Sequence, residues 1–255
     1  MTSEILKIDI EGPIATLTMN RPGKRNAMCD ELLDAIDAFF SAPPEGVRVV
    51  IMTGTEGHYC SGLDLSEHVA RNAEGTMRHS RNWHGVMDKI QFGGLPVISA
   101  MYGAVIGGGL EMAAATHVRI SEPSTIFQLP EGMRGIFVGG GATVRVGRIL
   151  GADRMCEMML TGRKYNSDEG LALGLTHYAV GEGEALALAQ KLAAKIAKNA
   201  TLSNYMMIQA ISRIEDMSKA DGLFMESMCA AVSQTSEDAE EGLKAFLEKR
   251  VPVFR

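Results

Sequence analysis

The chain has 255 residues, of which 46% are hydrophobic and 22% are charged, and its formal net charge is −6. This is the composition of an ordinary globular protein with enough apolar material for a buried core, which excludes general disorder. An acidic balance without a basic stripe argues against nucleic acid or an anionic membrane as the main partner. We therefore expect neither a nucleic-acid partner nor a membrane partner.

The four cysteines, Cys29, Cys60, Cys156 and Cys229, lie far apart, with no CxxC pair and no histidine at metal-ligand spacing. This pattern favours neither a zinc site nor a disulfide framework, and it indicates a reducing compartment. The N-terminus "MTSEILKIDIEG" lacks a basic flank followed by an apolar stretch, and no run approaches the roughly 18 apolar residues of a membrane span. We expect a cytoplasmic protein without a metal site.

The first elements are predicted in the order strand, strand, helix, strand. "EILKIDIEGPIATLTMN" alternates apolar and polar residues on either side of Glu11-Gly12-Pro13, which is typical of a β-hairpin. "DELLDAIDAFFSA" has apolar residues at helical spacing after Asp30, a candidate N-cap. "VRVVIMTG" predicts a short buried strand.

The same order then recurs loosely. The helical stretch "MRHSRNWHGVMDKI" leads to the strand "PVISAM", a Gly-rich turn and the helix "LEMAAAT". The strands "HVRIS" and "TIFQL" follow, and then a helix over about 140–150. Alternating strands and helices predict an α/β fold with a parallel sheet and helices outside.

The pattern changes after about Asn199, where three helical periods follow: "LSNYMMIQAISRIEDM", "DGLFMESMCAAVSQ" and "EDAEEGLKAFLEKR". We divide the chain into a core with the active site, 1–198, and a helical C-terminal region, 199–255. No linker rich in Pro, Gly or Ser separates the two parts. The C-terminal region is therefore expected to pack on the core or on a neighbouring subunit.

The stretch "YGAVIGGGLEMAAATHVRISEPSTIFQLPEG" places Glu111 just after a run of glycines, at the start of an apolar helix. A dinucleotide-binding turn fits the order of the elements here. The glycines do not fit it, because GxGxxG counted from Gly103 meets Val105, and counted from Gly107 it meets Met112.

Two interpretations of this stretch stay open on spacing alone. In the first, small residues let a helix pack tightly on the sheet, and Glu111 favours the helix N-terminus electrostatically; this leaves Glu131 unexplained. In the second, backbone N–H groups at the helix start form half of an oxyanion hole. Two carboxyl groups from adjacent strand-to-helix turns then face each other across one substrate, which suits general acid–base catalysis.

Five motifs resemble, in order and spacing, the crotonase family of enoyl-CoA hydratases and isomerases. They are "RPGKRNAM", "GHYCSGLDL", "PVISAMYGAVIGGGLEMA", "FQLPEGMRGI" and "AFLEKRVPVF", and they span nearly the whole chain. The resemblance implies a crotonase-type spiral of ββα units followed by a helical region used in trimerisation. It also implies a homotrimer or a dimer of trimers.

The resemblance assigns roles to four residues. The backbone amides of Leu63 and Gly108 would hold the thioester oxygen of the substrate. Glu111 would activate the water that adds at C3, and Glu131 would donate a proton to C2. These roles imply hydration of a 2-enoyl-CoA to a 3-hydroxyacyl-CoA, or the reverse dehydration, without a metal or a redox cofactor, since coenzyme A is part of the substrate.

The resemblance also implies where the acyl-CoA thioester lies. Coenzyme A would run along "RPGKRNAM" and the segment after Cys60, and the family usually has Pro where Val138 stands in "FVGGG". Lys24 would face the phosphates, and Phe246 and Lys249, from a neighbouring subunit, would contact the adenine and a phosphate. The remaining predicted contact residues are Ser61, Asp64, Leu65 and Gly139.

Alternatives within and outside the family differ in what they need. Double-bond isomerisation needs only one group to shuttle the proton, so the presence of both Glu111 and Glu131 favours a hydratase. A non-catalytic scaffold has little reason to keep both. His84 resembles a histidine of family dehalogenases, but "FVGGG" lacks the carboxylate nucleophile that those enzymes need. His84 is therefore predicted to be a pocket-wall or surface residue.

The acyl pocket is expected to be walled by Ser66 to Gly94. The segment "RNAEGTMRHSRNWH" within it is more polar than a long fatty chain favours. It indicates a short, branched, aromatic or heteroatom-bearing acyl group.

Overall fold

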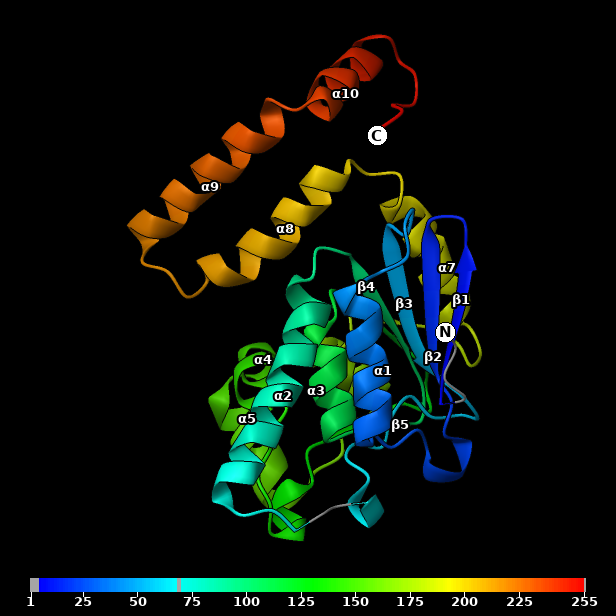
Figure 1. The fold of residues 1–255 in the computed structure, drawn as a ribbon, viewed down its shortest axis with the longest axis vertical. Coiled ribbons are helices and arrows are strands. Elements are labelled where there is room, and N and C mark those ends of the chain that lie inside the picture. The colour runs from blue at the N-terminus through cyan, green and yellow to red at the C-terminus, as the bar shows by residue number, and fades with distance from the viewer. Residues whose placement is uncertain (1–4, 68–69, 255) are drawn as a thin grey trace.

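The computed structural model describes residues 5–67 and 70–254, so His68 and Val69 of the predicted acyl-pocket segment lie outside it. In the described part of the chain the main sheet has six strands in the order β1-β2-β3-β4-β6-β8. Figure 1 labels the first four of them. Among the described strands of this sheet, only the β1–β2 pair is antiparallel, which confirms the predicted hairpin and parallel α/β sheet. The strands are β1 (Leu6–Glu11), β2 (Ile14–Met19), β3 (Val49–Gly54), β4 (Val97–Met101), β6 (Val118–Ser121) and β8 (Tyr178–Ala179).

Helices cover both faces of this sheet. On one face, α1 (Asp30–Ser41), α2 (Ala73–Phe92) and α3 (Gly108–Ala115) share a core with Val50 and Met52 of β3. On the other face, α7 (Ala185–Ile196) packs its alanines against Val49 and Ile51. Because both faces are covered, β3 is buried along its whole length, as its continuous apolar run predicts.

A second, short sheet pairs β5 (Ala104–Ile106) with β7 (Ile126–Gln128) in parallel. The sequence predicted only a Gly-rich turn where β5 lies. With β5 present, strand, strand and helix recur as β1-β2-α1, β4-β5-α3 and β6-β7-α4, where α4 spans Ala142–Leu150. This repeated unit is the predicted spiral of ββα turns.

Two helix boundaries differ from the prediction. Asp30 does not cap α1, because it is the first residue of the helix and Cys29 occupies the N-cap position. The carboxylate of Asp30 instead contacts Arg71 and His79. Helix α2 begins earlier than predicted, where the side chain of Asn72 accepts a 2.8 Å hydrogen bond from the Gly75 amide.

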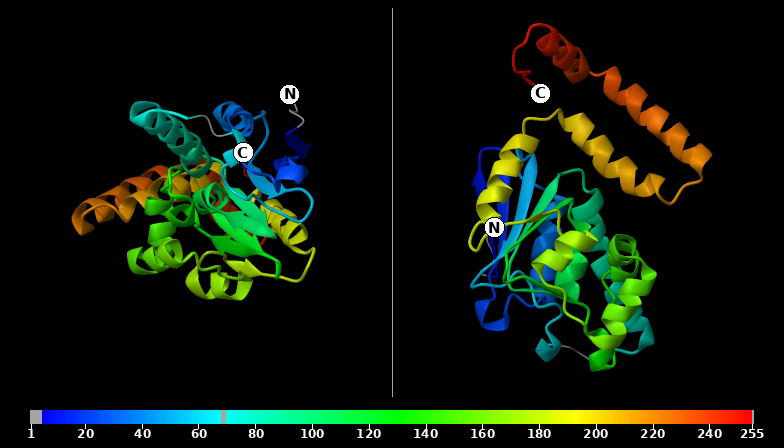
Figure 2. Two further views of the ribbon diagram at one scale, coloured as in Figure 1. Left: turned by 90° about the horizontal axis from the view of Figure 1, so that it is seen from below. Right: turned by 180° about the vertical axis from the view of Figure 1, so that it is seen from behind.

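The C-terminal helices extend away from the sheet as an arm (Figures 1 and 2). Large apolar side chains stay exposed along it, among them Phe224, Leu243 and Phe246, which is 79% exposed. An apolar surface of this kind supports the predicted contact with a neighbouring subunit, which stays a prediction together with the division at residue 199. The remaining helices are α5 (Ala152–Thr161), α6 (Ser167–Leu173), α8 (Thr201–Ile214), α9 (Lys219–Gln234) and α10 (Glu237–Leu247).

Within the described residues, no helix has both the length and the apolar character that a membrane span needs.

Candidate active site

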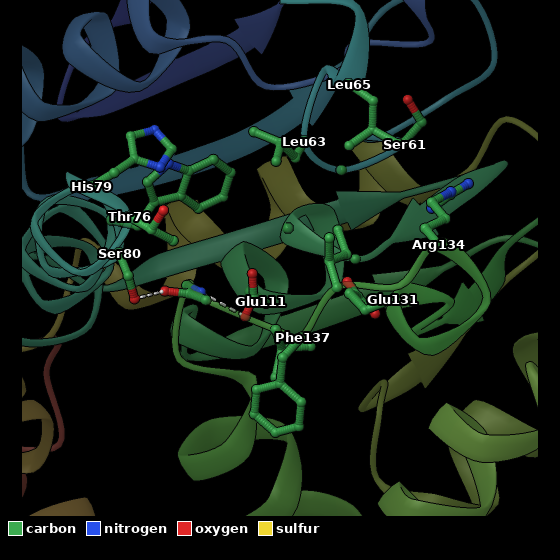
Figure 3. A pocket seen from close by; sticks show the side chains of 18 residues that line it. Ser61, Leu63, Leu65, Thr76, His79, Ser80, Glu111, Glu131, Arg134 and Phe137 are labelled. Atoms are coloured by element: carbon green, nitrogen blue, oxygen red, sulfur yellow. Dashed lines mark hydrogen bonds between the residues drawn. The ribbon is translucent and has the colours of Figure 1, made fainter. Parts of the chain in front are cut away.

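A hollow of about 160 Å³ lies where four segments meet (Figure 3). They are residues 61–65, the N-terminal half of α2, the start of α3, and residues 131–140. Seven predicted site residues line it: Ser61, Leu63, Leu65, Gly108, Glu111, Glu131 and Gly139. Among the described residues, the lining does not include the other four: Lys24, Asp64, Phe246 and Lys249.

Two backbone amides at the hollow, those of Leu63 and Gly108, have no hydrogen-bond partner among the described residues. Gly62 has a φ of +91°, and a Cβ there would lie only 3.2 Å from the Gly108 nitrogen, so the two turns touch. Across residues 5–67 and 70–254, neither N–H donates a hydrogen bond. The β-bridge between Met28 and Leu63 is formed by the Gly62 carbonyl and the Asp64 amide, so it does not use the Leu63 amide. Gly108 is the first residue of α3, where amides have no partner inside the helix. Together they suit an oxygen that gains negative charge.

Glu111 is held in one orientation at the floor of the hollow. It is only 3% exposed, and its Oε1 accepts hydrogen bonds from the amides of Gly140 (2.8 Å) and Ala142 (3.1 Å). Burial raises the pKa of this carboxyl group, while the two amides and the nearby Arg145 guanidinium oppose the rise. The carboxylate is therefore fixed and ready to accept a proton.

Glu131 is also buried, with 7% of its surface exposed, but it is much less restrained. It begins a short 3-10 helix, η3 (Glu131–Arg134), and no described residue hydrogen-bonds its buried Oε2. Burial raises its pKa to about 7, and the neighbouring charge of Glu111 adds to the rise. A carboxyl group with this pKa is partly protonated at neutral pH, so it can donate a proton.

The loop predicted to follow coenzyme A is held together from within. Asp64 is buried, forms a 3.1 Å ion pair with Arg21, and accepts a 2.6 Å hydrogen bond from the Ser66 hydroxyl group. These contacts, the Ser66 hydrogen bond foremost, lower the pKa of Asp64 to about 2. Lys24 donates to the Ser66 hydroxyl group at 2.6 Å, and 48% of its side chain is exposed. In this structure Asp64 shapes the loop; its contact with coenzyme A stays a prediction.

One face of α2 also lines the hollow, with Thr76, His79, Ser80 and Trp83; all four lie in the segment predicted to wall the acyl pocket, although none was predicted individually. Ser80 donates a 2.6 Å hydrogen bond to the Gly139 carbonyl, and a His79 ring nitrogen lies 2.9 Å from Asp30. Their spacing of three to four residues marks one helix face, but the sequence does not show that this face is turned to the site.

His84 lies just outside the hollow. Its Nε2 is 3.4 Å from the Ser80 hydroxyl group, and burial lowers the pKa of the ring. It is half-buried and is not among the lining residues in the described chain, so it does not form part of the wall of the hollow. Over the same residues, no group of three or more His, Cys, Asp or Glu side chains is placed to hold a metal ion.

Comparison with known proteins gives consistent matches over the full chain. The sequence profile described as Enoyl-CoA hydratase/isomerase matches residues 9–255. The Mus musculus protein named enoyl-CoA hydratase domain-containing protein 2, mitochondrial, is 35% identical, with 99% of this chain and 89% of that protein covered. A Rhodopseudomonas palustris CGA009 structure, provisionally described as an enoyl-CoA hydratase, is 44% identical with a TM-score of 0.94. The match covers 98% of this chain and 97% of that chain. The enoyl-CoA hydratase of Bacillus anthracis is 29% identical with a TM-score of 0.92 and covers 98% of both chains.

Proposed function

Because the chain belongs to the enoyl-CoA hydratase/isomerase family, we propose that it adds water to a 2-enoyl-CoA, giving a 3-hydroxyacyl-CoA, or catalyses the reverse dehydration. The observation that carries the proposal is that Glu111 and Glu131 line one hollow together with two free backbone amides. A hydratase needs one group to activate water and one to protonate carbon. It also needs donors for the enolate oxygen.

The mechanism follows from the two carboxyl groups. The thioester oxygen accepts hydrogen bonds from the amides of Leu63 and Gly108. Ionised Glu111 takes a proton from water as the water oxygen bonds to C3, and the double-bond electrons move toward the thioester oxygen. As the enolate collapses, C2 takes the proton of Glu131. The proton on Glu111 then returns to Glu131 through the solvent, so the net change is the addition of one water.

The test is mass spectrometry of the product from a panel of enoyl-CoA thioesters. A gain of one water by 2-enoyl-CoA supports hydration. Movement of a 3,4 double bond without gain of water supports the isomerase instead. Binding of CoA thioesters without turnover of any panel member supports the scaffold alternative.

Coenzyme A binding is proposed to involve two subunits. Lys24 is near the segment that follows Cys60, whereas Phe246 and Lys249 lie on or just after α10, at the far end of the arm from the N-terminal half of α2 (Figure 1). Both residues are exposed. We propose that they reach the hollow of a neighbouring subunit in a homotrimer or a dimer of trimers.

Subunit mixing tests this arrangement. Lys249→Ala removes a coenzyme A contact from the neighbour's site, and Glu111→Gln inactivates a subunit's own site. If the contacts are made between subunits, mixing and reassembling the two variants restores activity that neither has alone. Light scattering that gives a monomer mass, or mixtures no more active than their parts, overturns the proposal.

The acyl group is proposed to be short, branched, aromatic or heteroatom-bearing. The α2 wall of the hollow carries Thr76, His79 and Ser80, of which Ser80 bonds the Gly139 carbonyl and His79 contacts Asp30. Thr76 presents its hydroxyl group to the hollow, and an aliphatic chain offers no partner for such a group. Comparing kcat/KM for straight-chain, branched and aromatic enoyl-CoA thioesters tests this choice, and a clear preference for long straight chains contradicts it. The cytoplasmic location and the lack of a separate cofactor stay predictions.

A further inference from the structure

The single tryptophan of the chain, Trp83, lies between the two halves of the candidate site. It is 4% exposed, sits on α2 and lines the hollow. A Cβ built on Gly108 would lie 2.7 Å from Cζ3 and 2.9 Å from Cη2 of the indole. A Cβ built on Gly140 would lie 2.9 Å from Cε3 of the same ring. One edge of the indole is therefore packed against the backbone of both glycines.

These two glycines carry the two donor positions on which the proposed chemistry depends. The amide of Gly108 is one of the two free donors for the thioester oxygen. The amide of Gly140 donates the 2.8 Å hydrogen bond that orients Glu111. Between residues 108 and 140 the chain passes through two strands and η3, so the local backbone alone does not fix the distance between the two amides.

We infer that Trp83 is a positioning residue: its indole edge sets the Gly108 amide and the Glu111 carboxylate at a fixed separation. The inference rests on the proposed function, because the separation matters only if both groups act on one substrate. The indole N–H has no hydrogen-bond partner among the described residues, so packing rather than hydrogen bonding holds the ring. A flat, rigid side chain with two χ angles suits this role.

Replacing Trp83 by Leu removes the edge of the indole ring and leaves space into which the turns at Gly108 and Gly140 can move. A displacement of about 1 Å at a reacting group costs about 10²-fold in rate. We expect Trp83→Leu to lower kcat by about 10²-fold with a KM change below about threefold, because the contacts to coenzyme A lie elsewhere. Trp83→Phe, which keeps a flat ring of shorter reach, is expected to fall between Leu and wild type.

A second measurement does not depend on turnover. The infrared carbonyl band of bound butyryl-CoA, a saturated thioester, reports the hydrogen bonds donated to the thioester oxygen. We expect this band to lie at lower wavenumber in wild type than in Trp83→Leu. Met87→Ala is the matched control, since Met87 is fully buried on the same helix and does not line the hollow. It is expected to lower stability but to leave the carbonyl band unchanged.

The sharpest test adds a methyl group where the ring edge lies. Apart from the neighbouring backbone of α3, the two atoms nearest to a Cβ at Gly108 belong to Trp83, and the next is the Leu63 nitrogen at 3.6 Å. Gly108→Ala is therefore expected to lose at least tenfold in kcat, and Trp83→Leu in the same chain to recover part of it, so that the double variant exceeds Gly108→Ala alone. If the losses in kcat of Gly108→Ala and Trp83→Leu simply add in the double variant, and Trp83→Leu leaves the carbonyl band unchanged, the role of Trp83 is overturned. If the carbonyl band lies at lower wavenumber in wild type than in Trp83→Leu but wild type adds no water to a 2-enoyl-CoA, the proposed hydration is refuted and the positioning role stays supported.

Discussion

The turn that holds Glu111 and the turn that holds Glu131 differ more than their similar burial suggests. The oxygen of Glu111 is fixed by two amides from residues 140 and 142, in a turn that is itself packed against Trp83. Glu131 is followed by residues 132–137, all of which are exposed. The Oε2 atom of Glu131 has no hydrogen-bond partner among the described residues. Hydrogen bonds hold the carboxyl group of Glu111, whereas that of Glu131 is buried and restrained mainly by packing.

This difference matches the different work of a base and an acid. A base that orients water needs a fixed direction, and amide donors also favour its ionised form. An acid that protonates carbon needs a pKa near neutrality, and donors to its carboxylate would lower that pKa. The lack of a donor to Oε2 of Glu131 among the described residues is thus a functional property, although a buried polar atom without a partner costs stability.

The largest effect is expected from removing each proton function in turn. Glu111→Gln and Glu131→Gln should each lower the hydration rate by roughly 10² to 10⁴, because glutamine keeps the size but cannot exchange the proton. The affinity for CoA thioesters should change much less. The double variant should be little worse than the worse single variant, since the two groups act on one substrate as a unit. The rates are measured by loss of enoyl-CoA absorbance, with the fold checked by circular dichroism.

An isomerase gives a different pattern in this experiment. One variant would be inactive, the other nearly unaffected, and the product would carry no added water. Full hydration by Glu111→Gln would show that the carboxylate after the glycines is structural.

The next largest effect separates the rigid turn from the looser one. A Cβ at Gly140 would lie 2.6 Å from Oε2 of Glu111, and a Cβ at Gly107 would lie 2.8 Å from Oε1 of Glu131. Gly140→Ala should lower kcat by about 10²-fold, because Glu111 cannot move without losing its amide donors. Gly107→Ala should lower kcat by only about tenfold, because the described residues give Glu131 no pair of amide donors from another turn that it would lose on moving.

Gly135→Ala is the control for backbone strain in this pair. Gly135, like Gly107, has a positive φ, +70° against +53°, but a Cβ there meets nothing within 4 Å. Its replacement should lower stability with little effect on kcat. If Gly107→Ala and Gly140→Ala lose activity equally, the two turns do not differ in the way described.

The sequence predicted the parts of this fold that depend on local pattern. The hairpin β1-β2 alternates clearly, and the strand β3 is a continuous apolar run. Strand β5 could not be predicted, because its three residues lie between glycines and are too few to show a period of two. Asp30 was predicted to cap a helix because capping is local, whereas its actual neighbours, Arg71 and His79, come from distant segments.

The candidate site was predictable to a similar degree. The resemblance of "GGGLEMA" and "LPEG" to family motifs indicated Glu111 and Glu131, and both line the hollow. Their different restraints were not predictable, since the donors to Glu111 come from a turn about thirty residues later that only the fold brings close. Trp83 lies in the segment predicted to wall the acyl pocket, but it was not singled out, because its helical spacing indicates a buried face and not what that face covers.

A smaller effect is expected from pH. Hydration needs ionised Glu111 and protonated Glu131, and dehydration needs the opposite arrangement, so both directions use the pair with one proton bound. Burial raises the pKa of Glu131 to about 7, so kcat/KM should fall about tenfold per pH unit above about 7. Because the two working forms hold the same number of protons, the profiles for hydration and dehydration should coincide. A flat profile up to pH 9 would contradict the assignment of Glu131 as the acid.

The smallest effect concerns stability. The pKa of Glu131 is raised from 4.5 to about 7 by burial, so between these values the folded protein binds more protons at this site than the unfolded chain. The free energy of unfolding therefore falls as pH rises through this window, and the loss is complete above about pH 7. Glutamine carries no charge at any pH, so Glu131→Gln should be more stable than wild type at pH 8 by about 1–3 kcal/mol and nearly equal to it at pH 4. Thermal unfolding at the two pH values measures the difference, with Glu45→Gln, an exposed replacement, as the control. A Glu131→Gln variant less stable than wild type at pH 8 would mean that the carboxylate has a stabilising partner, and the contrast with Glu111 would then fail, because both carboxyl groups would be held by donors.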